Sequence, residues 1–319
     1  MPTTAIPTTA LPAPTMPTSA TLTDVLTLKP VDPEVFDVAF TATTGPCPWP
    51  KAYGGDMVAQ ALVAATRTVT DGKAIHSTHA YFLRPVDVGA EVRYEVEVLR
   101  DGRGYSTRQV RGFQHGKPVY VCLANFAAGE PGGSFQASMP DDVPAPDELP
   151  TSAACLDGRS GGTTTDAARA YWAGGRSVDM RHVPGPLYLA VDGGRVPTQA
   201  VWVAPYDVLR PVDGLTTAQR DAAALAYVCD YTILEPLLRV LGHAWADDGL
   251  VTASLDHAMW FHRPVAMDGW LLYAQEAWSV ADGRGSATGH FFTADGALVA
   301  TVVQEGMIRA TAPAKGDLS

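Results

Sequence analysis

The chain of 319 residues lacks several features that would place it in common functional classes. No window approaches about 18 uninterrupted apolar residues, so a membrane-spanning helix is not expected. The N-terminus has apolar residues but no basic segment before them, so it does not predict a secretory signal. The net charge of −11 argues against nucleic-acid binding, because such proteins need a basic face to neutralise phosphates. We therefore expect no nucleic-acid partner and no stable membrane association.

Cysteine is scarce, and its spacing argues against the common cysteine-based sites. Four cysteines lie far apart and form no C-x-x-C pair: Cys47, Cys122, Cys155 and Cys229. In a chain of this length the pattern indicates free thiols rather than a disulfide framework or a zinc site. We therefore expect a reducing, cytoplasmic location, and neither a metal ion nor another cofactor.

One strand-and-turn passage occurs twice, about half the chain length apart. HAYFLRP begins at His79 and HAMWFHRP begins at His257, and each passage continues to Asp-Gly-Arg-Gly. The other matched positions, such as Arg84 with Arg263, keep nearly the same offset. A unit that recurs once indicates a tandem duplication, because a solenoid needs at least three shorter repeats.

Each half has the pattern of one helix and an antiparallel sheet. In the first half, residues 53–69 carry small apolar side chains at helical spacing, and alternating strands follow at 75–85, 91–101 and 105–126. In the second half, residues 216–242 predict one helix that bends at Pro236 and ends at a glycine. Strands then follow at 250–264, 269–280, 285–292 and 297–309. We expect the two sheets to pair edge to edge, because each covers the exposed edge of the other.

These patterns divide the chain into five segments. The first is a Pro/Thr/Ala-rich tail with too little bulk to form a core, which we expect to be disordered. The connector between the halves is rich in Pro, Gly and Asp. The segments are the N-terminal tail 1–21, the N-terminal unit 22–135, the connector 136–175, the C-terminal unit 176–310 and the tail 311–319.

Three polar residues are candidates for a functional role. Asp230 lies in LAYVCDYTIL, and a buried, unpaired carboxylate costs several kcal/mol, so it is either a structural hydrogen-bonding group or a functional one. Gln304 interrupts ATVVQEG on the face of its strand that carries apolar neighbours, and Ser254 lies in VTASLDH. On local pattern alone, a structural role is the more common one for the last two.

Several motifs resemble one known family. YGGDMVAQAL, HAYFLRP, SLDHAMWFHRP and TVVQEGMIR are similar to motifs of the bacterial acyl-CoA thioesterase II family, and the resemblance spans residues 22–310 apart from the connector. It implies an α+β class, the double hotdog, in which each long helix lies in the palm of a curved antiparallel sheet. It also implies hydrolysis of acyl-CoA to a free acid and coenzyme A, and assembly into a dimer or larger homo-oligomer.

The resemblance implies catalytic roles for the same three polar residues. The family is described as using an Asp on the second helix, a Thr or Ser just before D-H-x-M-W, and the Gln of V-Q-E-G, which here are Asp230, Ser254 and Gln304. Asp230 would activate a water molecule held by Ser254 and Gln304. Donors for the developing negative charge would be the Gln304 amide or backbone N–H groups at a helix start.

Four further residues are candidates for substrate binding. The Gly54-Gly55 pair permits close approach of the backbone to a ligand. His79 and His257 recur in the two copies, which suggests substrate contact, although residues shared by both halves more often serve the fold.

Two alternative functions remain open at this point. A hotdog enoyl-CoA hydratase or dehydratase would require a catalytic His beside an Asp, and no convincing motif of that kind is present. A non-catalytic acyl-CoA or lipid-binding protein would have no reason to bury Asp230 and Gln304.

Overall fold

The computed structural model describes residues 17–162 and 164–310. Most of the predicted N-terminal tail (1–21) and the whole predicted tail 311–319 lie outside the described residues. The prediction of disorder is wrong for the last part of the N-terminal tail, because helix α1 (Thr18–Leu26) begins there. The start of α1 is buried, and the Ser19 backbone N–H donates to Asp207 Oδ1 at 2.9 Å. This bond holds α1 against the second half of the chain.

The strands occur in two series, one in each half of the chain, and include the predicted ones. Those of the first half are β1 (Lys29–Val31), β2 (Val38–Thr43), β3 (Ala74–Phe82), β4 (Glu91–Asp101), β5 (Tyr105–Gln114) and β6 (Lys117–Ala127). Those of the second half are β7 (Val178–Val183), β8 (Thr198–Pro205), β9 (Val251–Ser254), β10 (Asp256–Phe261), β11 (Leu271–Ala281), β12 (Arg284–Thr293) and β13 (Leu298–Arg309). The alternation of exposed and buried residues along β5 shows why such segments form strands with one face on the core.

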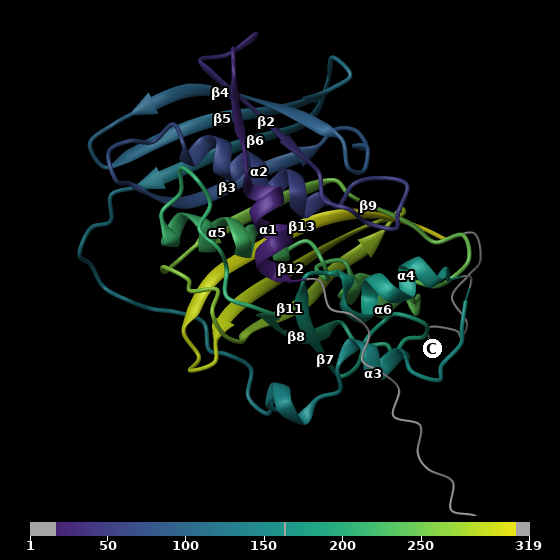
Figure 1. Ribbon diagram of the computed structural model, residues 1–319. Coiled ribbons are helices and arrows are strands. Elements are labelled where there is room, and N and C mark those ends of the chain that lie inside the picture. The colour runs from purple at the N-terminus through teal and green to yellow at the C-terminus, as the bar shows by residue number, and fades with distance from the viewer. Residues whose placement is uncertain (1–16, 163, 311–319) are drawn as a thin grey trace, which may run out of the picture.

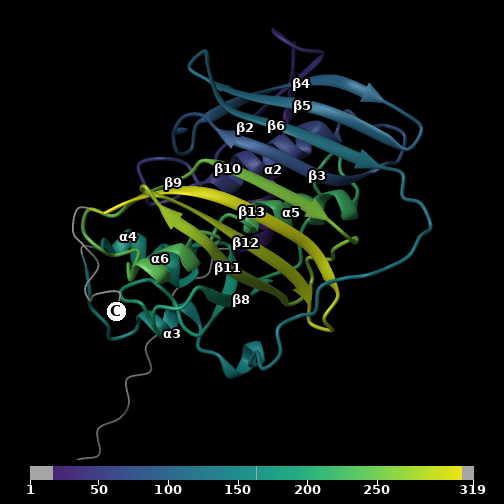
Figure 2. The ribbon, with the colours of Figure 1, turned by 180° about the vertical axis from the view of Figure 1, so that it is seen from behind.

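The strands form one sheet, and the two halves pair edge to edge as predicted. The strand order is β1-β2-β4-β5-β6-β3-β10-β13-β12-β11-β8-β7, with β9 paired to β13 beside this path. The halves meet where β3 runs antiparallel to β10, with Ala80 opposite His257. Figures 1 and 2 show the strands of the first half above those of the second half, in one continuous curved surface.

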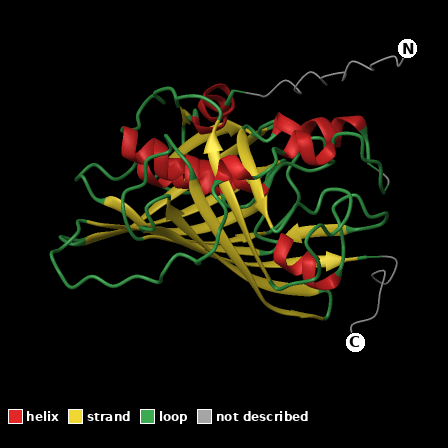
Figure 3. Cartoon of the chain, turned by 90° about the horizontal axis from the view of Figure 1, so that it is seen from below, coloured by secondary structure: helices red, strands yellow, loops and turns green. Residues whose placement is uncertain are grey.

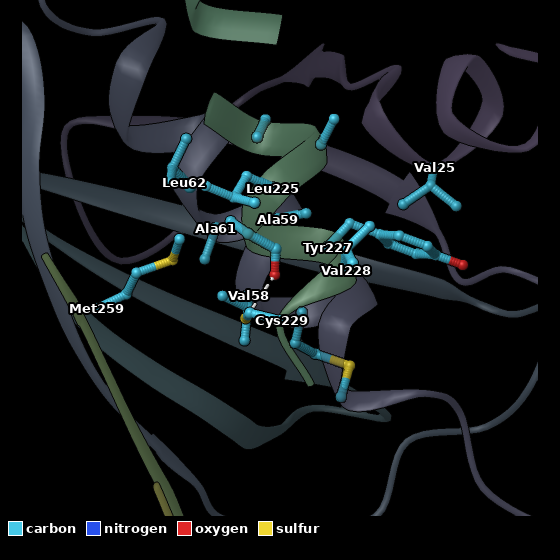
Figure 4. Packing of buried hydrophobic residues seen from close by; sticks show 14 of the residues in the cluster. Val25, Val58, Ala59, Ala61, Leu62, Leu225, Tyr227, Val228, Cys229 and Met259 are labelled. Atoms are coloured by element: carbon cyan, nitrogen blue, oxygen red, sulfur yellow. Dashed lines mark hydrogen bonds between the residues drawn. The ribbon is translucent and has the colours of Figure 1, made fainter. Parts of the chain in front are cut away.

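Two central helices, α2 (Gly54–Thr66) and α5 (Thr217–Val228), pack against each other inside this sheet. Small residues make the close contact possible, since Ala59 and Ala61 of α2 are fully buried. Figure 4 shows this packing, and Figure 3 shows helices lying along one side of the strands. Helix α5 begins where it does because Thr216 and Gln219 form a reciprocal capping box.

The predicted helix at 216–242 is two helices in the structure. Helix α5 ends at Val228, and α6 (Glu235–Leu241) begins after an irregular segment, with Pro236 in its first turn. The physical reason is that proline lacks the N–H needed to continue a helix and collides with the preceding turn, whereas it fits a helix start. The predicted end is confirmed, because Gly242 adopts a left-handed conformation with φ of 78°. Asp230 therefore lies on the irregular segment just beyond α5.

The predicted strand at 250–264 is also divided, at Leu255, into β9 and β10. The Leu255 backbone N–H donates to the Glu305 carbonyl oxygen, and the Leu255 carbonyl oxygen accepts from the Phe82 N–H, both at 2.9 Å.

The described residues of the predicted connector (136–175) contain four short helical segments: η1 (Pro146–Glu148), α3 (Ser152–Leu156), α4 (Asp166–Ala170) and η2 (Tyr171–Gly175). Within the described ranges, no helix is long and apolar enough to cross a membrane.

Candidate active site

Three polar side chains that are far apart in the sequence meet at one point. Asp230 Oδ1 accepts hydrogen bonds from Ser254 Oγ at 3.0 Å and from Gln304 Nε2 at 2.7 Å. Gln304 Nε2 also donates to Ser254 Oγ at 2.9 Å. The structure thus brings together all three residues that the sequence singled out, in a closed triangle of hydrogen bonds.

The secondary structure explains how these side chains converge. Strands β9 and β13 are antiparallel neighbours, with Ser254 opposite Gly306. Gln304 lies two residues from Gly306 along β13, so its side chain is on the same face of the sheet as that of Ser254. Gln304 points to the helix-covered face of β13 and is fully buried. The irregular segment after α5 then directs Asp230 between the two strands and the start of α2.

A cavity of about 540 Å³ adjoins this triangle. Asp230 and Ser254 are in its wall, whereas Gln304 lies behind them and does not line it. The wall is largely aromatic and apolar, and its aromatic members are Trp49, Tyr53, Phe82, Tyr171, Trp172, Tyr231 and Trp245. Its basic members are Lys51, Arg84 and Arg176. The size and the mixture of apolar walls with few polar groups are those of a small-molecule site.

The Gly54-Gly55 pair lies close against other parts of the chain. A Cβ atom on Gly54 would lie 2.4 Å from Asp230 Oδ2, and one on Gly55 would lie 2.3 Å from the Tyr227 carbonyl oxygen. Only glycine therefore lets the start of α2 come this close to the carboxylate. Gly54 lines the cavity and Gly55 does not. A substrate-binding role for either glycine stays a prediction.

Burial raises the pKa of Asp230 to about 6. Hydrogen bonds from Gln304 and Ser254, the Lys51 charge and the Gly55 N–H oppose this rise, since each favours the ionised form. Lys51 is held nearby because its Nζ donates to the Thr252 carbonyl oxygen at 2.6 Å. At neutral pH most of the Asp230 carboxyl groups are therefore ionised. The raised pKa also makes this carboxylate a stronger base than an ordinary aspartate, as general-base catalysis requires.

The two histidines that recur in the sequence are not equivalent in the structure. His257 is buried, and its Nε2 lies 3.0 Å from Cys229 Sγ, whereas His79 is exposed and stands edge-on to Trp260. The second motif has one extra residue between its His and its Arg-Pro, and a shift of one residue turns a strand side chain to the other face. Neither histidine lines the cavity, so the structure does not support the predicted substrate contact.

Sequence reasoning missed two groups at this site. Asp56 in the first turn of α2 is fully buried, and burial raises its pKa to about 7. Its Oδ2 accepts from the Gly45 N–H at 3.0 Å, and its Oδ1 has no partner within the described part of the chain. Arg176 follows the connector directly. An acidic residue at a helix start and an arginine beside a loop are both common, so neither gives a distinctive sequence signal.

The described residues contain no group of three or more side chains that could hold a metal ion. The four cysteines are free. The cavity wall offers a carboxylate, a hydroxyl, a helix start and three cationic side chains, and the Gln304 amide lies directly behind it.

Comparisons with known proteins agree with this fold. Two family profiles match, described as acyl-CoA thioesterase N-terminal domain over residues 45–127 and C-terminal domain over residues 140–308. Human acyl-coenzyme A thioesterase 8 is 34% identical over 298 residues, which are 91% of this chain and 89% of that protein.

Solved structures give the same result. An acyl-CoA thioesterase II from Mycobacterium marinum is 32% identical, with a TM-score of 0.69 over 93% of this chain and 99% of that one. A protein of unknown function with a hot dog fold from Alicyclobacillus acidocaldarius is 19% identical, with a TM-score of 0.70 over 91% of this chain and 98% of that one. The second likeness concerns the fold alone, and it confirms the expected double hotdog architecture.

Proposed function

The chain belongs to the acyl-CoA thioesterase family, and from this premise we propose that Asp230 is the general base that activates water for hydrolysis of the thioester. The enzyme is a thioester hydrolase acting on acyl-CoA. One observation carries the proposal: the Asp230 carboxylate stands in the cavity wall with one oxygen fixed by Ser254 and Gln304 and the other at the start of α2.

The hydrogen-bond directions around Ser254 define a place for the water. The Ser254 hydroxyl gives its only hydrogen to Asp230 and accepts one from Gln304, which leaves one lone pair free. A water molecule that donates one hydrogen to Asp230 and the other to Ser254 Oγ would present its own lone pair to the substrate. Asp230 takes the first hydrogen as the oxygen attacks the thioester carbonyl.

In this proposal Gln304 positions the Asp230 and Ser254 side chains. Its amide nitrogen donates to both Asp230 and Ser254, and the residue is fully buried behind the cavity wall. Because Gln304 does not line the cavity, it is poorly placed to donate to the developing oxyanion. The positive end of α2 at Gly54 and the Lys51 ammonium remain as the groups that stabilise negative charge in the cavity.

The leaving group needs little help from the protein. Coenzyme A departs as a thiolate, which is a good leaving group, so water can displace it without a covalent enzyme intermediate. The products are the free acid and coenzyme A. The proton held by Asp230 is then returned to the thiolate or to solvent, which regenerates the carboxylate.

The hydratase alternative lacks its essential group at this site. No histidine lines the cavity among the described residues. His257 is fully buried beside Cys229, and burial lowers its pKa to about 4, so it is neutral at physiological pH. The carrier alternative is disfavoured because it gives no reason to keep a carboxylate whose burial is unfavourable.

We also propose that the enzyme is cytoplasmic and forms a homo-oligomer. The free cysteines support a reducing compartment. Exposed aromatic side chains such as Tyr81 and Trp278 on the strands support contact with a second copy. Size-exclusion chromatography with light scattering over a concentration series tests the assembly, and a monomer at all concentrations contradicts it.

The function is tested by measuring the release of free thiol from straight-chain acyl-CoAs whose acyl chains have about two to sixteen carbons. Intact-protein mass spectrometry during turnover tests the mechanism in the same samples. The proposal expects thiol release with no acylated protein. An acyl adduct on Asp230 or Ser254 that forms and decays at the turnover rate contradicts the water mechanism and leaves the enzyme class in place.

A further inference from the structure

Arg176 lies in the cavity wall, and no carboxylate of the described residues forms a salt bridge or hydrogen bond with its guanidinium. It is 5% exposed, and within the described residues its guanidinium makes one hydrogen bond, from Nη1 to the thioether sulfur of Met180 at 3.4 Å. Its Nε has no acceptor within the described ranges. A guanidinium carries five N–H donors and stays charged at every physiological pH, so most of its hydrogen-bonding capacity is unused here.

The surrounding rings hold this guanidinium in place without neutralising it. Its Cζ lies 5.3 Å from the ring centroid of Tyr188 and 5.6 Å from that of Tyr231. The Tyr231 hydroxyl also donates to the Arg176 carbonyl oxygen at 2.6 Å. Cation–π contacts stabilise the orientation of an arginine but leave its N–H edge free for an anion.

Glu235, the acid that acts electrostatically on Arg176, forms its hydrogen bonds with other residues. It is fully buried, and its two oxygens accept from Trp245 Nε1 at 2.9 Å and from Gln199 Nε2 at 3.0 Å. It acts electrostatically on Arg176 and also on the fully buried Arg239. Arg239 also interacts electrostatically with Asp192, whereas Glu235 is the only carboxylate of the described residues that acts on Arg176, and it does so without a hydrogen bond.

The three cations of the cavity occupy different environments. Arg84 is exposed, and Lys51 lies beside Asp230, where the thioester is cleaved. Arg176 lies beyond Tyr231, whose ring stacks on Tyr53 at 4.3 Å. Because the bulky phosphates of coenzyme A need an open surface, Arg84 suits that end of the substrate. The enclosed Arg176 suits the far end of a short acyl chain.

From this arrangement we infer that the cavity accepts acyl chains that end in a carboxylate, and that Arg176 binds this carboxylate. The substrates would be coenzyme A thioesters of short dicarboxylic acids, and the reaction at Asp230 is unchanged. A guanidinium fork matches a carboxylate with two parallel hydrogen bonds, so the fit is specific as well as electrostatic. The inference deepens the proposed function and rests on it.

Paired substrates of equal length test the inference. The value of kcat/KM is measured for succinyl-, glutaryl-, adipyl- and suberyl-CoA, each against the straight-chain monocarboxylic thioester with the same number of carbons. We expect the dicarboxylic partner to be preferred by about 10- to 100-fold at one or more lengths, the range of one charge-assisted interaction. Arg176→Met should remove the preference and change the monocarboxylic value less than threefold, and Arg176→Lys should restore part of it.

The matched control is Arg84→Met, which removes the same charge from the exposed part of the cavity wall and should affect both members of a pair equally. Equal loss for both members in Arg176→Met would assign Arg176 to coenzyme A phosphates or to the scaffold, and would overturn the inference. Absence of any dicarboxylic preference in the wild type would overturn it too.

A second measurement needs no variant and separates this inference from the proposed function. Free adipate should inhibit the wild-type enzyme, or raise its melting temperature, at concentrations at least tenfold lower than hexanoate. If monocarboxylic thioesters are hydrolysed and adipate binds no better than hexanoate, only the inference fails. If no thioester is hydrolysed but adipate still binds selectively, the proposed function fails and the carboxylate-binding role of Arg176 stands.

Discussion

Replacing Gly54 by alanine tests the geometry around Asp230 with a single methyl group. The new Cβ would lie 2.4 Å from Asp230 Oδ2 and 3.2 Å from both the carboxyl carbon and Phe82 Cε1. An ordinary contact begins near 3.4 Å, so the carboxylate has to retreat by about 1 Å. Its other oxygen is held by Ser254 and Gln304, and a retreat of this size stretches or breaks those bonds. Misplacement of a catalytic group by about 1 Å lowers the rate by about 100-fold.

The effect on stability should be much smaller than the effect on activity. Alanine favours a helix over glycine by about 1 kcal/mol, which offsets part of the cost of weakening one charge-assisted hydrogen bond, about 1.5–3 kcal/mol. We therefore expect Gly54→Ala to lower kcat by about 100-fold and to change the free energy of unfolding by no more than about 2 kcal/mol. Thiol-release kinetics and urea denaturation measure the two quantities on the same preparation.

Gly132→Ala is the matched control, since a Cβ at Gly132 meets no atom within 4 Å. It should leave both kcat and stability at wild-type values. A folded Gly54→Ala enzyme with wild-type kcat would refute the reasoning, because it would show that the carboxylate can leave its observed position without consequence.

Three further predictions address pH, packing and the histidines. Because burial raises the pKa of Asp230 to about 6, kcat/KM should fall as the pH drops below about 6; Ser254→Ala removes a hydrogen bond that lowers this pKa, so the acid limb of its pH profile should move to higher pH. A Cβ on Gly289 would lie 2.2 Å from the Tyr273 ring, which stacks on Phe291, so Gly289→Ala should destabilise the fold by about 1–3 kcal/mol in urea denaturation. His79→Ala should leave kcat/KM within twofold, since His79 is exposed and lies outside the cavity; a larger loss would restore its predicted role in substrate binding.

Much of the fold follows from periodicity. The strand at Glu91–Asp101 has the predicted limits, and the helix at Gly54–Thr66 lies within its predicted range, because alternation and small-residue spacing act locally. The division of the second helix was missed, because a proline that bends a helix and one that starts a new helix are indistinguishable in the sequence. The ordered start of α1 was also missed, because its burial depends on contacts with residues such as Asp207, distant in sequence.

The site shows the same division between local and long-range information. Asp230 and Gln304 were recognisable as polar residues in apolar segments, whereas Ser254 gave a weaker local signal, and the family resemblance supported all three. Their convergence depends on the β9–β13 pairing and on the break after α5, which no local pattern encodes. The prediction that both histidines contact substrate treated the two motifs as equivalent. The second motif is one residue longer, and this shift places His79 and His257 on opposite faces of the sheet.

The measurement that tests the central claim most directly is kcat of Asp230→Asn with a well-hydrolysed acyl-CoA, on protein shown to be folded. Asparagine keeps the size of the side chain and an oxygen that accepts from Ser254 and Gln304, but it cannot take a proton from water. We predict a loss of about 100- to 10,000-fold in kcat, the usual contribution of a general base. A folded Asp230→Asn enzyme that keeps more than about a tenth of the wild-type kcat would contradict the account, because a step that loses its base cannot retain that rate.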